Sequence, residues 1–523
     1  MALLRAKGKV LQLIGRWPEA DASFRKCLDW AEQTGKELEM AESSLNIASL
    51  MIIRGDMEEA QSRLEQVSEV FVRTKQPVLL IKALTDLGNI CIKRADHQNA
   101  WANFQRCLDI SGETGLPGDL MKAYNGLGHT CLVRGDLKQA EEYFGKELAL
   151  AEQHQELYYL DLATSNLALV FQNQGHWEKS LDYHRKSIEI AALCGNQRSV
   201  AQGYVNRGTA YINRSRFNEA EDNYRKALLI YRRLGDRPGE AMALCNLGIV
   251  DGDRENFLSG LRHLHQSLKI NRRLGLTRME AVTLGGIGQI FLQRGKYKLA
   301  RRYLEQKLDI SKRYGLNKSA VYTELKLGII QNDTGRHQEA LSLLGECLAQ
   351  AGRMGDIELA SSLSEEMAKA FQRLGDHAKA VKKIEEAIVS SQSINAGDLL
   401  GPQLFLRGKL HLHSEQKELA AVCFQRALDL AGQNNQCLLA WRCRLHLAVA
   451  EAETSEARIK ELASLLAQSV TDREKAYAGY HLCLAGAARE YRKQSLDWLD
   501  KLHRETPVYE YSKMLGDILA LPE

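Results

Sequence analysis

Residues 201–240 read AQGYVNRGTAYINRSRFNEAEDNYRKALLIYRRLGDRPGE, and the pattern in this stretch recurs along the chain. Its apolar residues are spaced by three and four, which is typical of a helix with one buried face. Gly235 stands where a glycine commonly ends a helix, just after the last apolar residues. A separate column of glycines, such as Gly15 and Gly135, divides other units in the middle, after the first helix. Each unit therefore predicts a first helix, a tight turn, a longer second helix and a short turn.

Small residues recur every 40 positions in two columns of this pattern. The first column holds Ala20, Ala60, Ala100, Ala140, Ser180, Ala220, Gly260, Ala300, Ala340, Ala380 and Ala420. The second holds Gly8, Ala48, Gly88, Gly128, Ala168, Gly208, Gly248, Gly288, Gly328, Ala368, Gly408 and Ala448. Small residues let two helices approach closely, and bulky residues in the columns of Trp17 and Phe24 fill the space beside them. A register that never slips predicts one continuous stack of repeats.

The repeat resembles a known family. In the unit from Ala201 the characteristic columns read Tyr204, Arg207-Gly208, Tyr211, Phe217, Ala220, Tyr224 and Ala227-Leu228. They resemble the tetratricopeptide repeat (TPR), and the resemblance covers about residues 1–450. The usual repeat has about 34 residues and a proline after its second helix, whereas here the proline is absent and the second helix is longer. The chain is similar to the long subtype found in Pins-type spindle-orientation adaptors, kinesin light chains, bacterial Rap-type peptide receptors and sensor arrays of bacterial signalling ATPases and kinases.

The resemblance implies an all-α fold, a right-handed α-solenoid of about 12–13 helix-turn-helix repeats. We expect residues 1–450 to form the superhelix of 40-residue repeats. After Ala448 the phase fades, and we expect residues 451–523 to form degenerate repeats or capping helices of the same solenoid. Met1 lies where the first helix is already under way, with no N-cap before it, so we favour a cut from a longer protein over a native start.

Composition argues for an intracellular protein without a membrane span. The net charge is +4 and the sequence has no run of about 18 apolar residues. The first 20 residues lack the apolar core of a signal peptide. Cysteines such as Cys27, Cys107 and Cys131 occupy core columns and form no CxxC pair, which favours a reducing compartment. We therefore expect a cytoplasmic protein with no membrane partner.

The sequence gives no reason to expect catalysis. It contains no GxxxxGK[ST], HExxH or GxSxG motif. Asp251-Gly252-Asp253 resembles the start of a calcium loop, but Glu255 and Asn256 then stand where Asp or Asn and Gly are needed. We expect no enzyme, no catalytic residue, no metal and no cofactor.

A polar column lies two residues before the second small column, at Asn46, Asp86, Gly126, Asn166, Asn206, Asn246 and Gly286. Its helical neighbours are also mostly polar. Because this stripe is not the packing stripe, we expect it to face open space. Asparagine is a poor helix former, so its repeated use needs a reason, and its amide carries both a donor and an acceptor. Tolerance of asparagine on an exposed helix face is the alternative explanation.

In the resembled family this stripe faces a concave groove, where asparagines hydrogen-bond the backbone of an extended peptide. The resemblance thus implies peptide-binding residues at Asn46, Asn89, His129, Asn166, Asn173, Gln202, Asn206, Thr209, Asn213 and Asn246. Leu169, Met242 or Ile249 would supply apolar anchors. A second candidate surface is a basic edge at the ends of second helices, formed by Arg232, Arg233, Arg272, Arg273, Lys312 and Arg313. We favour a solvated face there, since RNA binding would want interleaved exposed aromatic residues.

These features predict a protein–protein interaction scaffold that binds a peptide or helical segment of a partner in the concave groove. The expected setting is a sensor or regulatory part of a bacterial signalling protein. Alternatives are a TPR array that controls a fused protease, kinase or ATPase, and a eukaryotic spindle-type adaptor. A P-loop or kinase signature upstream of Met1 would favour the fused enzyme. We do not expect nucleic acid as a partner; salt-dependent retention on polyanions would indicate it.

Overall fold

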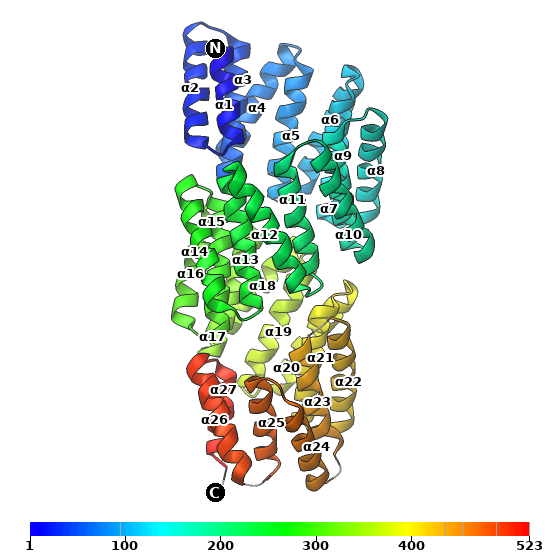
Figure 1. The fold of residues 1–523 in the computed structure, drawn as a ribbon, viewed down its shortest axis with the longest axis vertical. Coiled ribbons are helices and arrows are strands. Elements are labelled where there is room, and N and C mark those ends of the chain that lie inside the picture. Colours follow the sequence, from blue (N-terminus) through cyan, green and yellow to red (C-terminus); the bar gives the residue numbers. More distant parts are fainter. Residues whose placement is uncertain (95, 435, 453, 488, 522–523) are drawn as a thin grey trace. The chain divides into compact units, whose positions relative to one another are not determined.

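The computed structural model describes residues 1–94, 96–434, 436–452, 454–487 and 489–521. Within these ranges the regular secondary structure is entirely helical (Figure 1). This confirms the all-α fold class and the solenoid of helix pairs predicted from the sequence. None of the helices in the described part is long and apolar enough to cross a membrane.

The helices alternate as first (A) and second (B) members of each repeat. The A helices are α1 (Ala2–Leu13), α3 (Glu37–Arg54), α5 (Pro77–Lys93), α7 (Pro117–Arg134), α9 (Leu157–Asn173), α11 (Gln197–Ile212), α13 (Arg237–Asp253), α15 (Thr277–Gln293), α17 (Asn317–Asp333), α19 (Ile357–Arg373), α21 (Gly397–His413) and α23 (Cys437–Glu451). The B helices are α2 (Trp17–Gln33), α4 (Met57–Arg73), α6 (His97–Thr114), α8 (Leu137–Gln153), α10 (Trp177–Leu193), α12 (Phe217–Leu234), α14 (Phe257–Leu274), α16 (Tyr297–Arg313), α18 (His337–Met354), α20 (His377–Ser393), α22 (Lys417–Gln433) and α24 (Ser455–Gln468).

The helix spacing changes after α23. The last elements are α25 (Asp472–Leu484), α26 (Arg489–Glu505) and α27 (Tyr509–Leu519). Trp441, Tyr477, Tyr511, Met514 and Ile518 belong to one apolar cluster there. The assignment of residues 451–523 as degenerate capping repeats stays a prediction.

By its contacts the chain divides into two compact units. Unit 1 comprises Met1–Gly286 and Asp309–Asn317, and unit 2 comprises Ile287–Leu308 and Lys318–Glu523.

The turns follow the glycine pattern where a glycine is present. Gly135 after α7 and Gly235 after α12 have φ values of 84° and 66°. Glycine adopts this left-handed conformation with little strain because it has no Cβ. Lys75, Ser215 and Glu255 take the same conformation, with φ between 53° and 63°, in units that lack the glycine. The turn is therefore imposed by the packing of the two helices, because a residue with a Cβ is strained there by about 1–2 kcal/mol.

The packing of each repeat rests on the second small column. A Cβ placed on Gly128 of α7 would lie 2.6 Å from Phe144 of α8, and one on Gly88 of α5 would lie 2.5 Å from Phe104 of α6. Both phenylalanine side chains are fully buried. The aromatic ring of the B helix thus fills the place of the missing Cβ on the A helix, which confirms the predicted helix contact.

The A helices form the inner layer of each curved unit. Successive A helices contact one another directly, as α3 does with α5 and α5 with α7. Elements on the inner side of a curve are crowded in this way. The inner surface of A helices is called the concave face below.

Unit 1 curves far enough to meet its own beginning. Arg198 of α11 donates from Nη1 to the carbonyl oxygen of Leu13 at 3.5 Å. Gly15 lies against Pro238 of α13, since a Cβ on Gly15 would be 3.0 Å from the proline ring. Figure 1 shows α1 and α2 next to the green helices that follow α11. The turn after α1 therefore packs on the starts of α11 and α13.

The glycine column should tolerate no large side chain. A Cβ on Gly288 would lie 2.8 Å from Cγ of Leu304, so we expect Gly288→Leu to lower the free energy of unfolding by about 1–3 kcal/mol or more. Gly145, inside α8, is the matched control because a Cβ there meets no atom of the described residues within 4 Å. Gly145→Ala should raise stability by about 0.5–1 kcal/mol. Chemical denaturation measures both, and a Gly288→Leu protein as stable as wild type would contradict the helix contact.

A buried acid should give unit 1 a characteristic pH dependence. Glu147 of α8 is fully buried and accepts hydrogen bonds from Nδ2 of Asn125 at 3.0 and 3.2 Å. Burial raises the pKa of Glu147 to about 8, although the Asn125 bonds oppose the shift. In the unfolded chain this pKa is about 4.3. At pH values between these two pKa values, Glu147 therefore carries a proton in the folded state but not in the unfolded state. The free energy of unfolding falls as pH rises through that window.

Glu147→Gln removes the ionisable group and keeps the shape. We expect wild type to lose roughly a few kcal/mol of stability between about pH 4 and pH 8 relative to this variant. Urea denaturation of both proteins across the range measures the difference. Parallel stability curves for the two proteins would show that Glu147 ionises normally in the fold.

Candidate functional site

The residues predicted to bind a peptide all lie on A helices or at their ends, but their exposure differs. Asn89, Asn173, Gln202, Thr209 and Asn213 are exposed, whereas His129, Asn206 and Asn246 are half-buried. Asn46 and Asn166 are each only 5% exposed. The expectation that the whole stripe faces open space is therefore wrong for Asn46 and Asn166.

The burial of Asn46 and Asn166 has a geometric reason. The column of Asn46 and Asn166 points toward the B helix of the preceding repeat as well as toward the concave face. Gly126 of the same column shows this most clearly, because a Cβ there would lie 2.1 Å from the ring of Phe104. One edge of the predicted stripe is thus part of the contact between repeats, and only its other edge remains open.

Several of the predicted residues link neighbouring A helices. Asn206 donates from Nδ2 to Oγ of Ser165 at 3.2 Å and accepts from Nε2 of Gln202 at 3.0 Å. Asn46 accepts from Nζ of Lys82 at 3.3 Å. The ring of His129 packs edge-on against Phe144, with 5.4 Å between ring centroids, and burial lowers the pKa of this histidine. These polar groups therefore hold the concave face in shape as well as lining it.

An open polar stripe persists along α11. Gln202, Thr209 and Asn213 are exposed on one side of this helix, and Gln202 also accepts from the hydroxyl of Tyr231 at 3.3 Å. Thr209 lies 3.1 Å from the hydroxyl of Tyr224. Neighbouring side chains thus anchor Gln202 and Thr209, and the exposed stripe offers polar atoms on the concave face, which suits it to bind a peptide backbone.

Next to this stripe lies a pocket of about 320 Å³, here called the cross-turn pocket. It forms where the ends of α3 and α5 meet the starts of α11, α13 and α15, through the contact that closes unit 1 on itself. Its lining is mainly apolar, with several flexible methionines, which adapt well to varied ligands. The lining residues include Trp17, Ile52, Ile53, Met57, Lys93, Arg198, Gln202, Tyr231, Asp236, Pro238, Met242, Leu276, Arg278 and Met279.

Positive charge surrounds this apolar lining. Lys93, Arg198 and Arg278 line the pocket, and Asp236 is the acidic residue among the lining side chains. Nε of Arg198 lies 2.8 Å from Oδ2 of Asp236, whose other oxygen caps α13 at the amide of Gly239. Burial, together with the charge of Arg278, lowers the pKa of Lys93. The pocket is thus suited to an apolar side chain that has a carboxylate nearby.

Sequence reasoning identified Gln202 and Met242 here but missed Lys93, Arg198 and Arg278. These cations carry no local signal, because they come from three different repeats. They come together only through the curvature of unit 1.

The basic edge is largely engaged in local ion pairs. Arg232 pairs with Glu240 at 3.0 Å, Arg272 with Glu280 at 2.7 Å and Arg313 with Asp309 at 2.7 Å. Arg232, Arg233, Arg272, Arg273, Lys312 and Arg313 are all exposed at the ends of B helices. Because the basic member of each pair is exposed, the pairs contribute little stability, about 0–1 kcal/mol, yet they reduce the field available to a polyanion.

The two buried asparagines should respond differently to truncation. Asn46 donates from Nδ2 to the carbonyl oxygen of Glu42 at 2.9 Å and accepts from Lys82, so Asn46→Ala should cost about 1 kcal/mol. Nδ2 of Asn166 is buried and has no hydrogen-bond partner among the described residues. Asn166→Ala should therefore cost less, and alanine also favours the helix. Denaturant titrations compare the two variants; a larger loss for Asn166→Ala would mean that its amide is satisfied in solution.

Comparisons with known proteins agree with the repeat pattern. A family model described as tetratricopeptide repeat matches residues 1–71, 199–273 and 280–353, and a second model of the same description matches residues 162–195. A model described as anaphase-promoting complex subunit 5 matches residues 359–406. A comparison with curated proteins found no match.

Similar solved structures include a Rap protein complexed with competence and sporulation factor, which is 14% identical with a TM-score of 0.49 and covers 68% of this chain and 98% of that chain. The apo form of the quorum sensor NprR from B. thuringiensis is 16% identical with a TM-score of 0.48, covering 67% of this chain and 98% of that one. The Cut9–Hcn1 hetero-tetramer of the APC/C is 16% identical with a TM-score of 0.41, covering 99% and 96%. The matched repeat models, the 40-residue phase and the paired helices together show that the chain is a tetratricopeptide-repeat protein.

Proposed function

We propose that unit 1 binds an extended or helical segment of a partner protein along its concave face, with one apolar side chain of that segment in the cross-turn pocket. Tetratricopeptide repeats are protein-interaction scaffolds and generally not catalysts, and we assign no chemical step to the chain. The observation that carries the proposal is the continuity of the pocket with the polar stripe. Gln202 belongs to both, so a segment lying along α11 passes directly over the pocket.

The chemistry of this face suggests what the segment contains. Exposed amide and hydroxyl groups at Gln202, Thr209 and Asn213 offer both donors and acceptors for a peptide backbone. The methionine-lined pocket favours an aliphatic or aromatic anchor. Lys93 and Arg278 beside it favour an acidic residue close to that anchor.

The wider setting is also a proposal. We infer that the chain is a sensor or regulatory part of a bacterial signalling protein, by its resemblance to long-repeat arrays of that kind. Regulation of a fused protease, kinase or ATPase, and a eukaryotic spindle-type adaptor, are the alternatives. Cys27, Cys107 and Cys131 are buried thiols outside any disulfide, which supports a cytoplasmic location.

A displayed library of random peptides, selected on wild-type protein, supplies the probe for a test. We expect the selected peptides to combine an apolar anchor with an acidic residue. Met242→Glu places a carboxylate at the pocket and should weaken their binding by at least about tenfold. Replacing Asn206 and Asn246 together by Ala should weaken it by roughly 30-fold if two hydrogen bonds are lost. Fluorescence anisotropy with labelled peptides measures each affinity.

Leu258→Glu is the matched control for the pocket variant. Leu258 is exposed on α14, away from the concave face, and the substitution introduces the same charge. The Leu258→Glu protein should bind the selected peptides with the same affinity as wild type. Circular dichroism and thermal unfolding establish that all variants are folded. Equal affinities for wild type and Met242→Glu, with both proteins folded, would refute binding at the pocket.

A further inference from the structure

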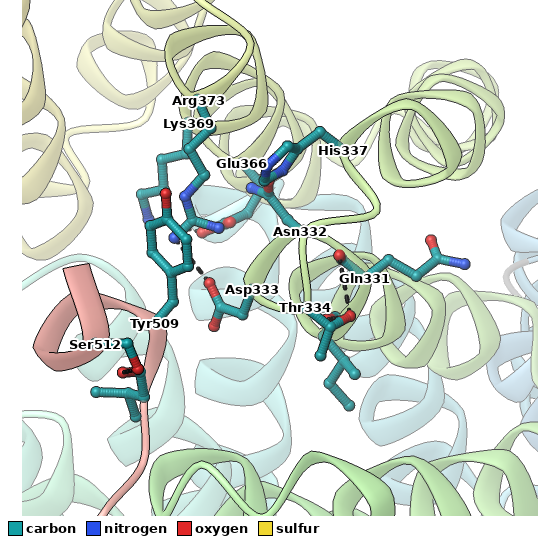
Figure 2. Close-up of polar contacts among 12 residues, drawn as sticks. Gln331, Asn332, Asp333, Thr334, His337, Glu366, Lys369, Arg373, Tyr509 and Ser512 are labelled. Carbon is teal, nitrogen blue, oxygen red and sulfur yellow. Dashed lines mark hydrogen bonds and ion pairs between the residues drawn. The ribbon is translucent and has the colours of Figure 1, made fainter. Parts of the chain in front are cut away.

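The concave face of unit 2 is contacted by the chain's own C-terminal helix. α27 begins at Tyr509, and its first two residues contact Arg373 of α19 and Arg442 of α23, together with Tyr297 of α16 and Tyr477 of α25. Figure 2 shows Tyr509 facing Arg373 of α19, with Asp333 of α17 beside them. This arrangement is distinct from the cross-turn pocket, which lies within unit 1.

Tyr509 is held by a cation and a hydrogen-bond chain. The guanidinium carbon of Arg373 lies 4.1 Å from the centre of the Tyr509 ring, which is the geometry of a cation–π contact. Arg373 also pairs with Asp333 at 2.8 Å. The amide of Tyr509 donates to the hydroxyl of Tyr297 at 3.4 Å, and that hydroxyl donates to Asp333 at 3.3 Å. The ring and the backbone of one residue are thus both recognised.

Glu510 is held even more closely. Its Oε1 accepts from Nη2 of Arg442 at 2.6 Å, and its Oε2 accepts from the hydroxyl of Tyr477 at 2.7 Å. Partial burial disfavours the charged form, but Arg442, Lys409 and the Tyr477 hydroxyl together lower the pKa of Glu510 to about 2. The carboxylate is therefore charged at neutral pH and engages charge-assisted hydrogen bonds.

Three cations around this pair stand in the repeat positions that form the polar stripe of unit 1. Arg373 is equivalent to Asn213, Lys409 to Thr209 and Arg442 to Gln202, because each is displaced by a multiple of 40 residues. In unit 1 these positions are exposed amides and a hydroxyl. In unit 2 the same surface carries cations, and it holds an aromatic ring and a carboxylate.

The contacts with α27 do not fill all the hydrogen-bond donors of these cations. Nη1 of Arg373 and Nε of Arg442 are buried and have no hydrogen-bond partner among the described residues. Burial and the charge of Arg442 lower the pKa of Lys409 to about 8, whereas Lys369 is paired with Glu365 and Glu366 on its own helix. The face therefore retains donors for a ligand with further acceptor atoms.

The rest of α27 is anchored elsewhere. Tyr511, Met514 and Ile518 are buried in the apolar cluster formed with α25 and α26. Tyr477 of this cluster also donates to Glu510, whereas the other groups that hold the first two residues of the helix, on Tyr297, Arg373 and Arg442, lie outside the cluster. Tyr509 and Glu510 are therefore separable from the part of α27 that covers the end of the solenoid.

We propose that the concave face of α17, α19 and α23 is a second binding site, specific for an aromatic residue followed by a glutamate at the start of a helical segment in a partner protein, and that Tyr509 and Glu510 occupy it as an intramolecular competitor. A tethered competitor acts at an effective concentration in the millimolar range. The partner segment and the first turn of α27 therefore exclude each other, and the free protein binds such a segment weakly until that turn is displaced.

The test uses the full chain and a labelled peptide of residues 506–519, TPVYEYSKMLGDIL, which carries the proposed motif. The protein variant combines Tyr509→Ala with Glu510→Gln, which removes the competitor and leaves Tyr511, Met514 and Ile518 in place. We expect this variant to bind the peptide at least about tenfold more tightly than wild type does. A further Arg442→Gln change should abolish the gain. The same peptide with Ala and Gln in place of its tyrosine–glutamate pair should bind none of these proteins.

Glu505→Gln is the matched control, since it makes the same chemical change at an exposed carboxylate of α26. It should bind the peptide as weakly as wild type does. Hydrogen exchange on unaltered protein gives a second readout that needs no variant: excess peptide should speed exchange across residues 506–511. Equal peptide affinity of wild type and the double variant, or unchanged exchange at saturating peptide, would show that Tyr509 and Glu510 only fasten the end of the solenoid.

Discussion

The contact between a large side chain of each B helix and the missing Cβ of its A helix governs the rest of this structure. Phe144 against Gly128 and Phe104 against Gly88 are examples of this contact. It fixes the distance and angle within a helix pair, because neither helix can shift without creating a clash or a cavity. Repetition of one pair geometry then fixes the relation between successive repeats, and with it the curvature of each unit.

The curvature of each unit brings together residues from distant repeats, and so distinguishes parts of an otherwise repetitive surface. In unit 1 the stack returns to its own beginning, so that Arg198 contacts Leu13 and Pro238 contacts Gly15. That closure brings an apolar pocket next to the polar stripe of α11. In unit 2 the concave face instead carries arginine and lysine, and it receives a tyrosine and a glutamate from α27. The same scaffold thus presents two chemically different concave surfaces on the same kind of helix pair.

The asparagine column shows which features of a surface can be predicted from a sequence pattern and which cannot. Its period placed every member on an A helix. It could not tell that the column lies at the edge between the concave face and the preceding B helix. Asn46 and Asn166 are consequently buried, while Gln202 and Asn213, nearby on the helical surface, are open. A rotation of a few tens of degrees about the helix axis separates these outcomes, and the positions of polar residues alone do not resolve it.

The sequence by itself determined the helix pairs, their phase and the residues that seat one helix on the next. These features depend on contacts within a repeat or between neighbouring repeats, and such contacts leave a periodic trace in the sequence. Only the tertiary structure decided that Lys93 and Arg278 share a pocket, and that Glu510 meets Arg442. The partners in each case are separated by many helices or by an irregular chain end. Their meeting depends on small rotations added over several repeats, which no local pattern records.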